Sequence, residues 1–383
     1  MAATSCPPVH LITPKASMLW PSARAQDTGL DMLLPSPKPA QVAQQLSPKA
    51  TLVSPHSAAE QYTHARIGCS SSRHAVDGTL SLSVRPTGWT HAVFGQAIRR
   101  LGAGTGGSVD LHYCPTTNKT LAIKTIQIAD EPTGSAQLSR RVLEELGIAA
   151  NVRHANIVRT FDVVVEPDRK CYMVMEACTV DLLSVLQQQV VTHGKHVTDS
   201  ELNTYFVQVV RGVHYLHAQG IGHRDLKLDN ICVTEHGTVK IVDFGCATLF
   251  RRRVPADLHA ELQGHSEVRY VETMSTGVCG SDPYIAPEVL AREWYSAACA
   301  DVWALGIVFF AMQNLQFPWA VAHEARDSGF KAFVRSPQTF IEKWFASDGA
   351  RGVMSRVLSV DPSQRASVSD VIHSSWFLSL VND

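Results

Sequence analysis

The segment IGHRDLKLDN, residues 221–230, crowds charged and polar side chains between apolar residues. Asp225 is suited to accept or orient the proton of a hydroxyl group, and Lys227 can neutralise charge on a transferring phosphoryl group. Asn230, five positions after Asp225, can bind a metal ion through its amide oxygen. Together these residue types favour transfer of a phosphoryl group to an alcohol.

A second carboxylate follows at a fixed distance. Asp243 comes 18 positions after Asp225 and directly follows VKIV, residues 239–242, which predicts a strand. A carboxylate at a strand end beside Asn230 forms an oxygen-rich site of the kind that Mg²⁺ prefers. We therefore expect Asn230 and Asp243 to be the metal ligands.

A glycine-rich stretch, LGAGTGGSV at residues 101–109, carries Gly102, Gly104 and Gly107 in G-x-G-x-x-G spacing. Glycine lets backbone N–H groups approach phosphate oxygens without a Cβ in the way. A dinucleotide-binding loop would open into a helix, whereas here SVDLHYC follows and predicts a strand. We expect this loop at the bend of a hairpin. The alternative function, a nicotinamide oxidoreductase, has no support in the sequence other than these glycines.

Lys124 stands inside the apolar, strand-like segment LAIKTIQIA, residues 121–129. A lysine in such a place indicates that its ammonium group meets anions, namely phosphate oxygens and a carboxylate. The helical spacing of residues 140–153 offers Glu144 and Glu145 as that carboxylate. We favour Glu145 and expect Glu144 to be solvated.

These residues need elements that bring them together. The segment 163–177 predicts two strands around a Pro-Asp turn, so the first part of the chain is rich in strands. Long helical patterns dominate the second part, at 181–190, 200–219, 298–313 and 365–380. A strand-rich part followed by a helix-rich part predicts an α+β fold of two lobes with a cleft between them.

At this point the sequence resembles the eukaryotic protein kinases. The family's motifs occur in the family's order, and the resemblance spans roughly 91–380. They are the glycine loop, Lys124 in an Ala-Ile-Lys strand, Glu145, His223-Arg224-Asp225 through Asn230, Asp243-Phe244-Gly245, Ala286-Pro287-Glu288, Asp301 with Trp303 and Gly306, and Arg365. The resemblance implies a bilobal kinase domain over 91–380, with a small lobe at about 91–177 and a larger helical lobe at about 178–380.

The resemblance also implies ATP and Mg²⁺ as ligands and assigns roles to residues. Lys124 is expected to hold the α- and β-phosphates and to pair with Glu145, while Asp225 acts as catalytic base with Lys227 beside it. Met175 is expected at the gatekeeper position beside the adenine. The implied nucleotide-binding residues are Leu101, Gly102, Ala103, Gly104, Thr105, Gly106, Gly107, Val109, Ala122, Lys124, Glu145, Glu176, Cys178 and Cys232. Glu288 and Arg365 are expected to form a buried structural ion pair, and Asp301 to anchor the catalytic loop.

The implied acceptor is a serine or threonine of a protein substrate. Lys227 and CGSDPYIAPE, residues 279–288, resemble the Ser/Thr kinases, in which a hydroxyl at the position of Ser281 contacts the catalytic residues. A nucleotide-binding pseudokinase or scaffold is the alternative, although such relatives usually lose one of the four groups Lys124, Asp225, Asn230 and Asp243. A small-molecule kinase is disfavoured by the intact activation segment, which runs from Asp243 to Glu288 and ends on the Ala-Pro-Glu motif.

Regulation and specificity are suggested by further charges. Arg224 precedes Asp225, and phosphorylation of Thr273, Ser275 or Thr276 by an upstream kinase would give it an anion. Asp181 and Asp229 lie where some kinases recognise arginine before the phosphorylated residue.

On the helix of Glu145, Ala149 stands where kinases usually have a bulky apolar residue. This predicts weaker packing against Phe244 unless Ile148 fills the gap.

GAGTGGSV, HRDLKLDNICVTEHGTVKIVDFG, GVCGSDPYIAPEV and FPWAVAHEARDSGFKAF together resemble the fungal halotolerance and nitrogen-permease-reactivator kinases. That group carries long Ser/Pro-rich amino-terminal tails and acts on plasma-membrane transporters in ion and nutrient homeostasis. Residues 1–90 of this chain, rich in Ser and Pro without apolar periodicity, predict a disordered tail that is short for the group.

The composition of the chain argues against several classes of protein and of binding site. With 34 Lys and Arg against 35 Asp and Glu, the chain shows no sign of bulk nucleic-acid binding. The nine cysteines contain no CxxC pair, so zinc is not expected, and their odd number argues against a complete disulfide framework. A reduced compartment fits best. No secretory signal or transmembrane segment is indicated. We therefore expect a soluble, cytoplasmic protein.

Overall fold

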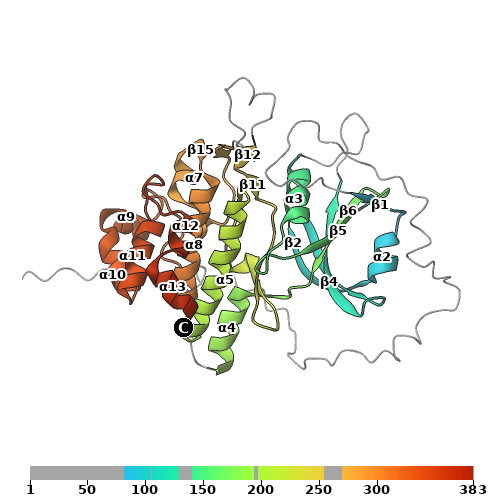
Figure 1. Ribbon diagram of the computed structural model, residues 1–383, viewed down its shortest axis with the longest axis horizontal. Coiled ribbons are helices and arrows are strands. Elements are labelled where there is room, and N and C mark those ends of the chain that lie inside the picture. Colours follow the sequence, from blue (N-terminus) through green and yellow to red (C-terminus); the bar gives the residue numbers. More distant parts are fainter. Residues whose placement is uncertain (1–81, 105, 129–139, 194–196, 254–269, 383) are drawn as a thin grey trace, which may run out of the picture. The chain divides into compact units, whose positions relative to one another are not determined.

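The computed structural model describes residues 82–104, 106–128, 140–193, 197–253 and 270–382 (Figure 1). All of them belong to the compact unit Ala65–Asp383. The predictions for residues 1–81 of the tail and for Thr105 lie outside the described residues.

A six-stranded sheet forms the strand-rich part, in the order β1-β5-β6-β4-β3-β2. All neighbours are antiparallel except β1 and β5. The strands are β1 (Ser83–Val84), β2 (Ala97–Gly104), β3 (Gly107–Cys114), β4 (Lys119–Gln127), β5 (Thr160–Glu166) and β6 (Lys170–Glu176). The strand predicted at 121–129 is β4, and the two strands predicted within 163–177 are the later part of β5 and all of β6. The hairpin predicted at the glycine-rich loop joins β2 to β3.

The fold begins before residue 91, where the predicted domain starts. Helix α2 (Trp89–Phe94) follows β1, and the carboxylate of Glu166 accepts hydrogen bonds from the backbone N–H groups of Gly88 and Thr90, at 2.6 and 2.8 Å. Trp89 and Phe94 pack against the apolar cluster that contains Tyr172. Residues 82–90 are thus part of the folded structure, whereas the sequence predicts that they belong to the tail.

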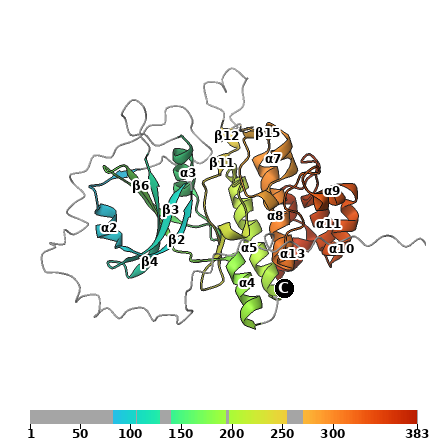
Figure 2. The same ribbon diagram turned by 180° about the vertical axis from the view of Figure 1, so that it is seen from behind.

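Helix α3 (Arg140–Asn151) lies beside the sheet in both views (Figures 1 and 2). Its buried residues join a core cluster that includes Phe244. Ile148 and Ala149 are 2% and 1% exposed and both belong to this cluster. Both residues thus lie in the core that contains Phe244, and whether Ile148 compensates for the small Ala149 stays a prediction.

The helix-rich part contains all the remaining α-helices that the described residues form. They are α4 (Leu182–His193), α5 (Asp199–Ala218), α7 (Pro287–Ala291), α8 (Ala297–Asn314), α9 (Ser328–Arg335), α10 (Pro337–Trp344), α11 (Asp348–Val357), α12 (Val368–Ile372) and α13 (Ser375–Asn382). Two short 3-10 helices accompany them, η2 (Leu228–Asn230) and η3 (Asp282–Tyr284). Helices α5 and α8 lie side by side in the middle of this part (Figures 1 and 2). The α+β, two-lobe prediction is confirmed.

One predicted helix is divided. The segment 365–380 forms α12 and α13 with a break between them. Ser367 begins α12 with a capping box to Asp370, and the hydroxyl of Ser374 accepts a hydrogen bond of 3.1 Å from the backbone N–H of Phe377. Serine oxygens that satisfy free N–H groups favour a new helix start, and apolar periodicity does not report them.

Helix α8 differs from the other long helices in that apolar residues cover all of its sides. Among the described helices it alone is long and apolar enough to cross a membrane, but 78% of that stretch is buried inside the protein. A helix buried on all faces is expected to be apolar all round. Its one buried acid, Asp301, is 0% exposed and serves the site described below.

One three-stranded sheet and three two-stranded sheets, all small, complete the described helix-rich part. They are β7 (Val180–Asp181) with β9 (Ile231–Val233) and β10 (Val239–Ile241), β8 (Ile221–Gly222) with β11 (Thr248–Leu249), β12 (Arg251–Arg253) with β13 (Tyr270–Glu272), and β14 (Ser275–Thr276) with β15 (Trp294–Tyr295). The β9–β10 hairpin positions the two predicted metal ligands, because η2 ends at Asn230 directly before β9 and Asp243 follows β10.

Candidate active site

Asp301 of α8 holds the turn that carries Asp225. Its carboxylate accepts hydrogen bonds from the backbone N–H groups of His223 and Arg224, at 2.8 and 2.7 Å, and contacts Nε2 of His217 at 2.9 Å. Arg224 adopts a left-handed φ of 66°, which a side chain rarely accepts without support. A fully buried carboxylate on a core helix provides that support, so the hydrogen bonds to Asp301 hold the backbone before Asp225 in place.

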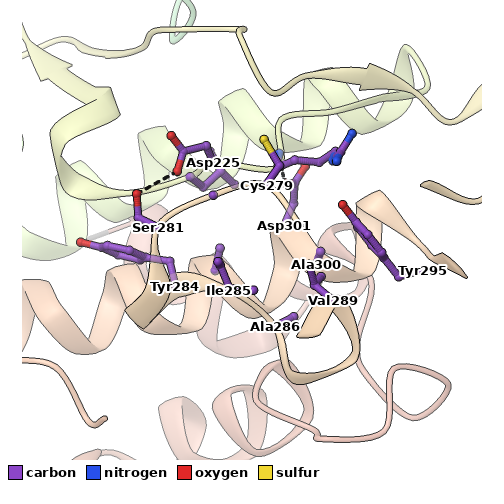
Figure 3. A pocket seen from close by; sticks show the side chains of 14 residues that line it. Asp225, Cys279, Ser281, Tyr284, Ile285, Ala286, Val289, Tyr295, Ala300 and Asp301 are labelled. Carbon is purple, nitrogen blue, oxygen red and sulfur yellow. Dashed lines mark hydrogen bonds between the residues drawn. The ribbon is translucent and has the colours of Figure 1, made fainter. Parts of the chain in front are cut away.

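Asp225, Lys227 and Ser281 form a closed network. The hydroxyl of Ser281 donates to Oδ1 of Asp225 at 3.1 Å (Figure 3). It also accepts a hydrogen bond from Nζ of Lys227 at 2.9 Å. Lys227 also lies 3.1 Å from Oδ2 of Asp225. The amide nitrogen of Asn230 donates to the same Oδ2 at 3.0 Å. The four residues come from two segments more than fifty positions apart and meet at one carboxylate.

Lys124 bridges the sheet and the helix-rich part. Its Nζ lies 2.5 Å from Oε1 of Glu145 on α3 and 3.1 Å from Oδ1 of Asp243. Burial disfavours the ammonium charge, but the two carboxylates outweigh it and raise the pKa of Lys124. Burial likewise disfavours the carboxylate of Asp243, and the nearby Lys124 still lowers the pKa of that carboxyl group. Both groups are therefore charged at neutral pH.

The choice between the two glutamates is settled by their surroundings. Glu145 is 5% exposed and bonded to Lys124. Glu144 points elsewhere and forms an exposed pair with Arg140 at 3.2 Å. The preference for Glu145 agrees with this geometry.

A backbone hydrogen bond brings Asn230 and Asp243 close together. The N–H of Val242 donates to the carbonyl of Asn230 at 3.0 Å, so the residue before Asp243 is bonded to Asn230 itself. Asp243 has φ of 62° and accepts from the N–H of Gly245 at 3.2 Å. The two hydrogen bonds of the Asn230 amide nitrogen to Asp225 leave its amide oxygen as the donor for a cation.

At two positions of the loop, the surroundings explain why the residue is glycine. Gly107 has φ of 120°, and a Cβ there would collide with the carbonyl of Thr125. A Cβ on Gly106 would lie 3.3 Å from Nζ of Lys124. Leu101, Gly102, Ala103 and Gly104 are the last four residues of β2, and Ala103 pairs with Ser108. The loop thus turns back directly over the lysine that is expected to hold phosphate.

The residues expected around adenine come from both parts of the fold. Val109 of β3 pairs with Lys124, and Ala122 of β4, two residues before that lysine, pairs with Met175. From the other part, Cys232 of β9 is 8% exposed. A hydrogen bond with the Cys178 thiol, together with burial, raises the pKa of Cys232. The segment after β6 and the strand β9 therefore lie in contact at these two sulfurs.

Glu176 has a further role that its sequence position does not show. Its carboxylate lies 3.0 Å from Nζ of Lys240 on β10 and accepts from the N–H of Arg159 at 3.3 Å. These contacts fix the end of β6 where the chain passes to the helix-rich part.

The expected ion pair of the helical lobe is present. Arg365 donates to both oxygens of Glu288, at 2.6 and 2.9 Å, and also to the carbonyl of Cys299. Its guanidinium lies 5.0 Å from the ring centre of Trp303. These hydrogen bonds pair the buried cation with its counter-charge and hold Glu288 of α7 against the residues around Arg365.

Ser275 and Thr276, two of the candidate phosphorylation sites in the activation segment, differ in their exposure. The guanidinium of Arg224 donates to the carbonyls of Thr276 and Gly277 at 3.2 and 3.3 Å. Thr276 is exposed, whereas Ser275 is only 7% exposed. Of the two, the hydroxyl of Thr276 is the one that a second protein can reach.

Two contacts around this segment were missed by sequence reasoning. Cys246 and Cys279 form a disulfide, and Arg141 of α3 donates to the carbonyl of Gly245 at 3.0 Å. The cysteines are 33 positions apart and follow no motif spacing, and Arg141 is one of many exposed arginines. A Cys directly after Asp-Phe-Gly and another directly before Gly-Ser-Asp-Pro-Tyr were the available signal, because both motifs border the same site.

Comparison with known proteins agrees with this geometry. The model of the family described as "Protein kinase domain" matches residues 96–377. The chain is 33% identical over 305 residues to a probable serine/threonine-protein kinase, RTK1, of Saccharomyces cerevisiae, covering 75% of this chain and 45% of that protein. It is 37% identical to the serine/threonine-protein kinase oca2 of Schizosaccharomyces pombe, covering 63% and 34%, and 36% identical to the nitrogen permease reactivator protein of S. cerevisiae, covering 61% and 27%. The alignments span less than half of the length of these relatives.

Proposed function

Because this chain belongs to the protein kinase family, we propose that it is a Ser/Thr kinase that transfers the γ-phosphoryl group of ATP to proteins. The observation that carries the proposal is Lys124, whose ammonium group lies within 3.1 Å of both Glu145 and Asp243. This contact joins the expected phosphate-holding lysine to the expected metal-binding carboxylate. Positioning and charge neutralisation are what phosphoryl transfer requires.

The donor set of the site fits Mg²⁺. Asp243 offers a carboxylate whose side chain is 50% exposed, and Asn230 beside it offers an amide oxygen. Among the described residues no group of three or more His, Cys, Asp or Glu gathers, so a closed all-protein metal site is not found there. Mg²⁺ prefers one or two protein oxygens together with water and substrate phosphates. When bound there, Mg²⁺ neutralises charge on the phosphates of ATP.

The residues of the chain then have separate tasks. Asp225 accepts the hydrogen bond of the substrate hydroxyl and orients it toward the γ-phosphorus. Lys227 offsets the charge that develops on the transferring group. The hydroxyl of Ser281 holds the two side chains at their present separation. The presence of Lys227 and Ser281 beside Asp225, as in the Ser/Thr kinases, supports serine and threonine as acceptors.

We extend the proposal to substrate and regulation in three respects. The carboxylates of Asp181 and Asp225 act electrostatically on Asp229, so three acidic residues lie near one another here and suit basic substrate peptides. Thr276 is the proposed site for an upstream kinase, since Arg224 already contacts its carbonyl. The similarity to the nitrogen permease reactivator protein supports a role in transporter regulation, carried out in the cytoplasm.

A phosphotransfer assay tests the proposal. The full chain, radiolabelled ATP and Mg²⁺ are combined with peptide libraries that differ only in a central Ser, Thr or Tyr. We expect label in the Ser and Thr peptides, and its loss by a factor of at least about 10² in Asp225→Asn and in Asp243→Asn. Glu235→Gln, a change at a side chain that is 87% exposed, is the matched control and keeps full activity.

Two results would overturn the proposal in different ways. Nucleotide-induced stabilisation against heat without any phosphate transfer would identify a binding scaffold. Label confined to the Tyr peptides would exclude the Ser/Thr class.

A further inference from the structure

The disulfide between Cys246 and Cys279 connects the two arms of the active site. Cys246 lies three positions after Asp243, the expected metal ligand, and Cys279 lies two positions before Ser281, which bonds to Asp225. Figure 3 shows Cys279 beside Asp225 at the pocket below the catalytic loop. A single covalent bond therefore fixes the start and the end of the activation segment relative to each other.

The surroundings of Cys246 favour a reactive sulfur. A guanidinium nitrogen of Arg141 lies 3.9 Å from its Sγ and 3.0 Å from the carbonyl of the preceding Gly245. A nearby cation stabilises the thiolate, which is the form that attacks a peroxide. Both Cys246 and Cys279 are half-buried, so small oxidants and reductants can reach them.

Another cysteine shows the opposite environment. Cys171 is 0% exposed, and burial, with a smaller contribution from Glu145, raises the pKa of its thiol to about 12. At neutral pH this thiol stays protonated and shielded. Reactivity toward oxidants is thus expected to differ strongly between cysteines of the same domain.

We propose that Cys246 and Cys279 are a reversible oxidation site, at which a hydroperoxide forms the disulfide that holds the activation segment in its assembled position. Cys246 is the sulfur that meets the peroxide, and Cys279 is the resolving thiol.

The chemistry balances in two steps. The thiolate of Cys246 attacks one oxygen of the hydroperoxide, the O–O bond breaks, and an alcohol leaves while Cys246 becomes a sulfenic acid. The thiolate of Cys279 then attacks the sulfur of Cys246, the S–S bond forms, and water leaves. The two sulfurs lose two electrons to the O–O bond. A dithiol reductant restores both thiols by exchange and becomes a disulfide itself.

The direction of the effect follows from the state that the structure shows, and it rests on the proposed kinase function. With the disulfide formed, Lys124 is bonded to Glu145 and Asp243, and Ser281 is bonded to Asp225 and Lys227. Reduction releases a segment whose ends are 33 positions apart and gives it more conformations. We therefore expect the oxidised form to be the more active one.

Mass spectrometry tests the site independently of activity. The full chain is reduced with dithiothreitol, freed of it, and treated with one equivalent of hydrogen peroxide. We expect the peptide linked through Cys246 and Cys279 to dominate among disulfide products and to disappear after renewed reduction. In Cys279→Ser we expect a dimedone-reactive sulfenic acid at Cys246. No linked peptide, or equal linkage to other cysteines, would overturn the proposal.

Activity measurements test the consequence. Reduction is expected to lower kcat by at least about threefold, and peroxide to restore it. Cys246→Ser and Cys279→Ser should stay at the reduced level under both conditions, whereas Cys299→Ser, a half-buried cysteine outside the site, should respond like the wild type. A linked but equally active enzyme would overturn the regulatory role. If no form transfers phosphate, the kinase proposal fails while the mass-spectrometric result still stands.

Discussion

The hydroxyl of Ser281 lies 3.1 Å from Oδ1 of Asp225, although the two residues are 56 positions apart. Ser281 belongs to the activation segment, so its position reports whether that segment is in place. The same hydroxyl accepts a hydrogen bond from Lys227 at 2.9 Å. The site is thus complete only when the segment has docked.

Replacing Ser281 tests this dependence. Ser281→Ala removes one hydroxyl that serves two catalytic side chains, and we expect kcat to fall by about tenfold or more, since 1.4 kcal/mol corresponds to a factor of ten. Ser281→Thr keeps the hydroxyl and should retain most activity. Steady-state kinetics with one peptide substrate provide the measurement. A fall confined to the KM for ATP would contradict the role given to Ser281.

The pair of neighbouring glutamates offers a matched comparison. Glu145→Gln weakens the only carboxylate of α3 that contacts Lys124, and we expect kcat/KM for ATP to fall by at least about tenfold. Glu144→Gln, one residue earlier on the exposed face, should leave it unchanged. In a Lys124→Met background Glu145→Gln should have little further effect, because the partner is already gone. Equal losses in both glutamine variants would contradict the geometry.

The buried pair of Glu288 and Arg365 should dominate stability among the ion pairs of the helical part. Their side chains are 2% and 0% exposed, so Glu288→Gln leaves a buried guanidinium without its counter-charge, at a cost of about 3–5 kcal/mol in unfolding free energy. Asp348→Asn, in a pair whose acid is 97% exposed, should cost less than about 1 kcal/mol. Urea unfolding measures both. Similar small costs would show that the buried pair is not essential to the fold.

The contact between Lys124 and Asp243 predicts a definite dependence of stability on pH. The folded-state pKa of Asp243 lies below its ordinary value of 3.8, so its contribution is present above that value and is lost as the pH falls through the folded-state pKa. The pKa of Lys124 lies above its ordinary value of 10.5, so its contribution is present below that value and is lost as the pH rises through the folded-state pKa.

Between these limits the contribution should be constant. We expect the difference in unfolding free energy between wild type and Asp243→Asn to stay flat from about pH 5 to about pH 9 and to shrink below about pH 4. Urea unfolding at stepped pH values gives this difference. A difference that changes through pH 6–8 would indicate that another titrating group controls the pair.

Much of the candidate site could be anticipated because each chemical task restricts the residue type. A phosphate-holding cation within a strand, two oxygen donors for Mg²⁺ and a carboxylate beside a lysine leave few substitutes, so Lys124, Asn230, Asp243 and Asp225 are visible without coordinates. Their convergence depends on long-range pairing, which the order of strands and helices suggests and the structure describes.

The remaining features depend on contacts that no local pattern reports. The first described elements, β1 and α2, are too short for apolar periodicity. Strand β1 pairs with β5, and the start of α2 is bonded to Glu166, 76 positions after Thr90. The division of the segment 365–380 depends on the hydroxyls of Ser367 and Ser374 rather than on apolar spacing. The disulfide joins two cysteines 33 positions apart, and no local pattern reports their pairing.

The apolar character of α8 has a consequence for how the chain is made. During synthesis Ala297–Asn314 leaves the ribosome after α5 but before α11, two of the helices that contact it. In that interval a segment with the length and hydropathy of a membrane span has only part of its cover. We therefore expect newly made chains to benefit from chaperones at this stage, and slow translation beyond Asn314 to prolong the exposure of this apolar segment.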